Sequence, residues 1–133
     1  MAVLSALLGA LSAPGCRGAA PQAAQPSLAV YRVPGMLGDT RPTPLDELRL
    51  SALPLLTDSD LVWYDWSVHE FQVSEDAGRR LPLQDVLAPA FVLVVDGVRI
   101  YAGAFCTGFS SYSCSAPAIM AKVHPTVLVI RRA

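Results

Sequence analysis

The segment from Phe91 to Phe105, FVLVVDGVRIYAGAF, constrains the fold of this chain most, because an Asp-Gly pair interrupts an apolar run. A type I′ turn needs a positive φ at both central positions, and Asp96-Gly97 is a pair that tolerates it. The segment therefore predicts a β-hairpin. In the simplest register one face is apolar and consists of three pairs: Val95 with Val98, Leu93 with Ile100, and Phe91 with Ala102.

The other face of this hairpin carries Val92 and Val94 opposite Tyr101 and Arg99. A strand that is apolar on both faces is typical of the centre of a sheet. Exposed aromatic and arginine side chains are favoured at protein interfaces. We therefore expect Arg99 and Tyr101, together with Trp66, to form a contact surface.

Other segments predict further strands and short helices. Patterns of β-branched, aromatic and alternating residues predict strands at 28–33, 47–52, 61–65, 68–73 and 126–131. Ser74 is a predicted N-cap, and Pro82 limits the helix that follows, although a second turn can continue through 83–88. Thr57 and Asp60 predict a further helical turn, because their spacing is close to that of a capping box. We expect a single small α+β domain, an antiparallel-rich sheet with one or two short helices.

The N-terminal residues resemble an export signal. Ala2 to Leu11 is an apolar run of signal-peptide length, and small residues precede Cys16 as they do in bacterial lipoproteins, where the cysteine is lipidated. No basic residue precedes Arg17, which leaves open whether Met1 is the true start. We expect three regions: a signal-peptide-like segment at 1–16, a flexible tether at 17–27 and the domain at 28–133.

Cysteine usage is consistent with export. Of three cysteines, lipidation or removal of Cys16 leaves Cys106 and Cys114, which enclose seven residues. In an oxidising compartment this pair predicts a disulfide. The spacing matches no zinc motif, and the chain has only two histidines to complete one. The predicted location is the periplasm or the cell surface.

His69 is the first candidate for a catalytic residue, with Ser110 or Ser111 as the nucleophile. However, no G-x-S-x-G elbow surrounds either serine. A histidine on an apolar strand face is more often a packing residue than a base, so we expect no catalytic residue here.

Asp58, Asp60 and Asp65 are the candidate ligands for calcium, but their segment lacks the glycine and the distal glutamate of an EF-hand loop. Helix capping explains the first two with fewer assumptions. We therefore expect no metal and no cofactor.

Charge argues against nucleic-acid binding, and hydropathy argues against a membrane-spanning helix. The formal net charge of −1 argues against nucleic-acid binding, which relies on basic patches. There is no run of roughly 18 apolar residues, so we expect no spanning helix. The remaining expectation is an unknown protein partner in the envelope, with membrane anchoring through a lipidated Cys16.

Two blocks of the chain resemble a known group of proteins. LVWYDWSVHEF is followed by FVLVVDGVRIYAGAF and a Ser-rich segment. This order is similar to that of small uncharacterised bacterial exported proteins and lipoproteins with a "YDW…H" segment and a "VDG.RIY.GAF" hairpin. A fainter likeness is to the head of the first periplasmic domain of the Sec translocation subunit SecD. The resemblance implies export and supplies no catalytic residue.

We therefore expect a non-catalytic exported or lipid-anchored envelope domain that acts through protein or surface contacts. One alternative is a small periplasmic hydrolase that uses His69 with a serine. Another is a cytosolic globular domain, in which the apolar N-terminus is simply packed.

Overall fold

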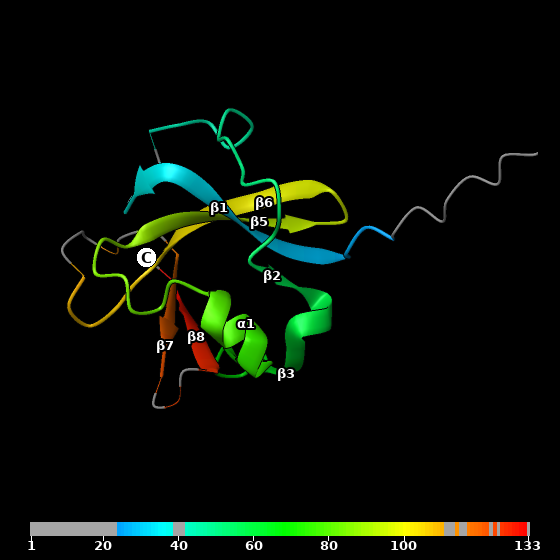
Figure 1. Ribbon diagram of the computed structural model, residues 1–133, viewed down its shortest axis with the longest axis vertical. Helices are drawn as coiled ribbons and strands as arrows, with labels where there is room; N and C mark the ends of the chain where they lie inside the picture. The colour runs from blue at the N-terminus through cyan, green and yellow to red at the C-terminus, as the bar shows by residue number, and fades with distance from the viewer. Residues whose placement is uncertain are drawn as a thin grey trace, which may run out of the picture.

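The computed structural model describes residues 24–38, 42–110, 114, 117–122, 124 and 126–132. Its strands are β1 (Leu28–Leu37), β2 (Leu56–Thr57), β3 (Leu61–Asp65), β4 (Glu70–Val73), β5 (Pro89–Val95), β6 (Val98–Phe105), β7 (Ala118–Ala121) and β8 (Val127–Arg131). They form one sheet in the order β2-β1-β5-β6-β7-β8-β4-β3. This sheet curls into a nearly closed barrel, with β1, β5 and β6 on one side and β7 and β8 on the other (Figure 1).

The predicted α+β class is wrong, because strands make up 45% of the described structure and helical residues 9%. The helical residues are a 3-10 turn, η1 (Asp58–Asp60), and one short helix, α1 (Glu75–Arg80). Residues 83–88, considered as a second helical turn, form tight turns between Pro82 and Pro89. The predicted strand at 47–52 is a loop.

The hairpin of β5 and β6 turns at Asp96-Gly97, where φ is 48° and 78°. Val95 pairs with Val98 as predicted, but the register then shifts. Val94 pairs with Arg99 and Leu93 with Tyr101, so that Ile100 is an extra residue on β6. Such a β-bulge re-aims the side chains that follow it. The predicted pairs of Leu93 with Ile100 and Phe91 with Ala102 are therefore wrong.

The sheet has one parallel pair, β6 with β7, and it is short: Ala104 pairs with Ala118 and Phe105 with Ile119. A Cβ atom at Gly103 would lie 2.2 Å from the carbonyl oxygen of Pro117, so only glycine allows this close approach. The connection between the two strands contains the predicted disulfide.

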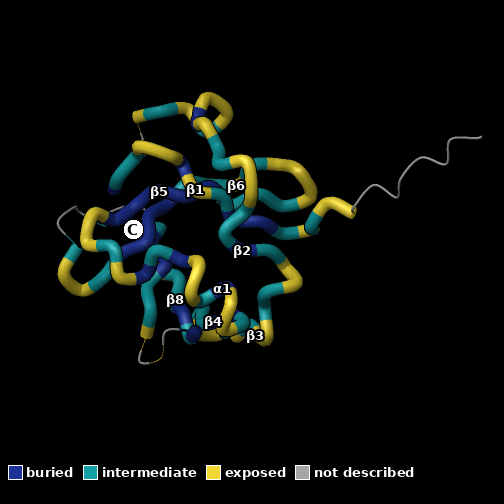
Figure 2. The backbone as a smooth tube through the Cα atoms, viewed as in Figure 1, coloured by how far each residue is buried: buried dark blue, intermediate teal, exposed yellow. Residues whose placement is uncertain are grey.

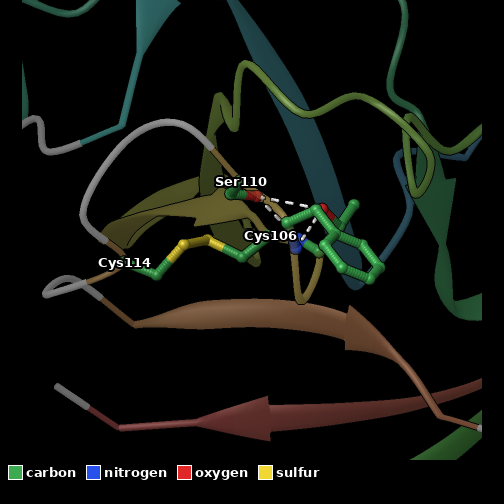
Figure 3. The surroundings of a disulfide bond; sticks show 5 residues. Cys106, Ser110 and Cys114 are labelled. Atoms are coloured by element: carbon green, nitrogen blue, oxygen red, sulfur yellow. Dashed lines mark hydrogen bonds between the residues drawn. A yellow bond between two sulfur atoms is a disulfide. The ribbon is translucent and has the colours of Figure 1, made fainter.

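Cys106 and Cys114 are joined by this disulfide, with their Cα atoms 6.4 Å apart (Figure 3). Cys106 lies directly after β6, is buried, and its amide donates to the carbonyl of Ile119. The bridge therefore braces the loop that brings β7 back beside β6.

The two edge strands of the sheet, β2 and β3, are connected through η1. Asp60 accepts hydrogen bonds from Thr57, whose backbone nitrogen lies 2.9 Å away, and forms an ion pair of 2.9 Å with Arg80 of α1. The predicted N-cap Ser74 accepts a hydrogen bond from the backbone nitrogen of Ala77. These contacts hold α1 beside η1, the segment that connects the two edge strands.

The predicted signal-like segment at 1–16, Cys16 and residues 17–23 of the predicted tether lie outside the described residues. The last tether residue, Ser27, accepts a hydrogen bond from the backbone nitrogen of Asp96 and donates one to Asp58. In the part of the chain that the structure describes, no helix has the length and apolar character needed to cross a membrane.

Candidate binding pocket

The interior of the barrel-like sheet is only partly filled by side chains. One region, here called the packed part, is well buried and lies outside the cavity. Its residues are Val73, Ala77, Leu81, Leu83, Phe105 and Leu128. Buried segments gather towards the centre of the molecule, whereas many surrounding loops are exposed (Figure 2).

The rest of the interior is a pocket of about 680 Å³, to which every strand contributes. The floor is buried and apolar and is formed by Val30, Leu56, Phe71, Phe91 and Ile119. The more exposed side, here called the open part, consists of Tyr64, Trp66, His69, Leu93, Ile100 and Tyr101. Volumes of roughly 300–1,000 Å³ with mostly apolar linings are typical of small-molecule sites.

The bulge on β6 determines part of the pocket lining. Because Ile100 is the extra residue, both Ile100 and Tyr101 line the pocket. The ring of Tyr101 meets Phe91 edge-on, with ring centroids 6.2 Å apart. The sequence pattern places Tyr101 on the outward face because strict alternation does not anticipate a bulge.

The turn between β3 and β4 supplies the aromatic rim. His69 has a φ of 53°, the left-handed conformation that ends this turn. Its Nδ1 lies 3.2 Å from the hydroxyl of Tyr64. Trp66, which is 78% exposed, packs edge-on against the Tyr64 ring at 4.6 Å between centroids. The rim therefore presents polar atoms on otherwise apolar groups.

The pKa of Tyr101 differs from the ordinary value of a phenol. Burial raises the pKa of its phenol, and the neighbouring Tyr64 raises it further. No hydrogen bond from its hydroxyl joins it to any other residue that the structure describes. Among the described residues, every side-chain nitrogen or oxygen that is fully buried from solvent has a hydrogen-bond partner. The Tyr101 hydroxyl is therefore neutral at physiological pH and accessible from the pocket.

The hydrolase hypothesis requires His69 beside a serine, and no such contact is present among the residues that the structure describes. His69 contacts Tyr64, whereas Ser110 Oγ accepts a hydrogen bond of 2.7 Å from the amide of Thr107 (Figure 3). Among the described residues no hydrogen bond connects His69 to Ser110, and Ser111 lies outside them.

The three aspartates considered as calcium ligands each have a local role. A hydrogen bond from Ser27 lowers the pKa of Asp58, and bonds from Ser67 lower that of Asp65. Asp60 contacts Thr57 and the Arg80 guanidinium. Across the described ranges no three His, Cys, Asp or Glu side chains gather as metal ligands would.

The structure separates Arg99 from the other two residues of the expected contact surface, Trp66 and Tyr101. Arg99 Nη1 donates to the carbonyls of Leu45 and Leu48, at 2.7 and 2.8 Å, and so holds the loop over the outer face. Trp66 and Tyr101 instead line the pocket. Tyr64 and Leu93 also line it. The sequence pattern places both on apolar strand faces but does not mark either as a site residue.

Fold and site together define a small β-barrel-like domain with one disulfide and an open apolar interior. Comparisons of the chain with protein families, with curated proteins and with solved structures found no match.

Proposed function

We propose that this domain is an exported, non-catalytic binding protein that holds a small apolar molecule inside its barrel-like sheet. The observation that carries the proposal is the pocket of about 680 Å³ lined from all eight strands. Barrels of about eight strands are either filled by their own side chains or hold one small ligand. In this domain the packed part is filled by side chains, and we propose that the open part holds the ligand.

The character of the lining supports binding rather than chemistry. Aliphatic and aromatic groups dominate it, and few lining side chains carry polar atoms: Tyr64, Trp66, His69, Tyr101 and Arg132. Pockets of this type gain affinity from apolar area and orientation from a few polar contacts. We therefore propose a non-catalytic domain whose binding site is the pocket interior, in addition to any contact surface on its outside.

Export is part of the proposal and has two supports. The disulfide between Cys106 and Cys114 is of a kind that persists in oxidising compartments. The apolar run at Ala2 to Leu11 has the length of a signal-peptide core. Lipid attachment at Cys16 would hold the domain near a membrane, where apolar molecules are abundant.

The test is a fluorescence titration of the full chain with N-phenyl-naphthylamine, an uncharged probe that becomes bright in apolar surroundings. We expect saturable binding to one site. Leu93→Trp should remove it, because the larger ring fills the pocket. Val98→Trp is the matched control, since Val98 is 61% exposed and lies outside the lining.

Thermal unfolding of both variants establishes that they are folded. If Leu93→Trp does not fold, Ile100→Trp at the open part replaces it. Absence of saturable binding to the unmodified chain, or equal binding by folded Leu93→Trp and Val98→Trp, would contradict the proposal.

A further inference from the structure

The polar groups of the pocket include one hydroxyl that lacks a protein partner. Within the described residues, Tyr64 is paired with His69, whereas Tyr101 has no hydrogen bond. An accessible phenol is hydrogen-bonded to water, and a ligand that displaces this water keeps the favourable interaction only if it accepts the hydrogen bond itself. The Tyr101 hydroxyl is a donor at neutral pH because burial, with a smaller effect of Tyr64, keeps its pKa above the ordinary value.

A cation lies in the same lining. Arg132 follows β8 and lines the pocket, and it forms no ion pair with another residue in the described ranges. Carboxylates on β3 and β4 are engaged elsewhere: Asp65 accepts hydrogen bonds from Ser67, and Glu70 is paired with Lys122. Arg132 is therefore available to an acidic group of a ligand.

We infer that the pocket takes a long-chain amphiphile with a terminal carboxylate. Its apolar chain lies on Phe91 and the aliphatic lining, and its carboxylate accepts hydrogen bonds from the Tyr101 hydroxyl and from Arg132. This inference rests on the proposed function, because it names the ligand class of the same pocket. An open, mostly apolar cavity with donors and no unengaged carboxylate suits this chemistry better than a sugar or a cationic ligand.

The test displaces bound N-phenyl-naphthylamine with three ligands of matched chain: palmitic acid, methyl palmitate and hexadecanol. We expect the acid to bind about tenfold more tightly than the ester, which corresponds to one charge-assisted contact. Tyr101→Phe and Arg132→Gln should each reduce that preference several-fold and leave binding of the ester within about twofold. The control Tyr31→Phe removes a hydroxyl outside the pocket lining and should change nothing.

The outcomes separate this inference from the proposed function. If ester and acid bind equally, or if Tyr101→Phe and Arg132→Gln keep the full preference for the acid, the carboxylate assignment is overturned and the pocket proposal stands. If neither the probe nor any of the three ligands binds, both fail. Loss of the hydroxyl of Tyr101 breaks no protein hydrogen bond in the described structure, so Tyr101→Phe should fold normally.

Discussion

The packed part of the interior and the pocket share strands β4, β6 and β8, but side chains fill the first completely and the second only partly. On β8, Leu128 is fully buried in the packed part, whereas Ile130 lines the pocket. On β6, Phe105 is buried, whereas Tyr101 reaches the open part. The strands therefore do not decide which region is filled.

The difference comes from what covers each region. The packed part receives Ala77 of α1 and the following Leu81 and Leu83, all buried. The open part is bordered instead by the turn between β3 and β4, with exposed Trp66. One part of the interior is therefore closely packed, and another part stays open as a pocket.

The largest expected effect is on the free energy of unfolding, when a residue of the packed part and a residue of the pocket lining are truncated on the same strand, β8. Leu128→Ala should lower the free energy of unfolding by about 3 kcal/mol, because it leaves a cavity in closely packed surroundings. Ile130→Ala, two positions along β8, should cost about 1.5 kcal/mol, because that side chain already borders open space. Urea unfolding measures both. Equal losses would show that the two regions are packed alike.

The disulfide should affect stability without affecting binding. Replacing both Cys106 and Cys114 by Ala should lower the unfolding free energy by about 2.5 kcal/mol, from the entropy of the short loop that is no longer closed. Neither cysteine lines the pocket, so probe affinity should be unchanged. Unmodified protein in reductant is the matched comparison. If the folded double variant also loses probe affinity, the disulfide contributes to the shape of the pocket, and this prediction is wrong.

The smallest effect concerns Asp60, which joins η1 to α1. Burial alone would raise its pKa, but the hydrogen bonds from Thr57 and the Arg80 guanidinium outweigh it and lower the pKa. A lowered folded-state pKa means that Asp60 stabilises the protein above the ordinary carboxyl range, and that this contribution is lost as the pH falls through the folded value.

Asp60→Asn should therefore cost about 1 kcal/mol at neutral pH and progressively less in acid. Thermal unfolding across this pH range, with the exposed Asp46→Asn as control, measures the effect. A penalty that is independent of pH would show that the charge of Asp60 does not matter.

Features of the fold were predictable where the chemistry of one or two adjacent residues determines the local backbone. Asp96-Gly97 predicts its turn because the two residues tolerate a positive φ, and Ser74 predicts the start of α1 because its hydroxyl accepts a free amide. The disulfide between Cys106 and Cys114 followed from cysteine counting and the short spacing.

Features that depend on distant residues were not predictable. The bulge at Ile100 turns Tyr101 to the face opposite to the expected one. It depends on how the whole sheet curls, and the alternating pattern within the hairpin does not reveal it. Strand β7 is four residues long and pairs in parallel with β6 over only two of them, so it has no local signature. The pocket follows from the joint volume of side chains from all strands, which no single segment encodes.

The most direct test of ligand binding in the open part is to map where an apolar ligand contacts the domain, using backbone amide signals in a nuclear magnetic resonance titration with palmitic acid. We expect the changes to concentrate at Tyr64, Trp66, His69 and Tyr101, while Leu83 and Leu128 in the packed part remain unchanged. Changes spread evenly over the domain, or confined to residues outside the pocket, would contradict the claim that the open part of the interior is the binding site.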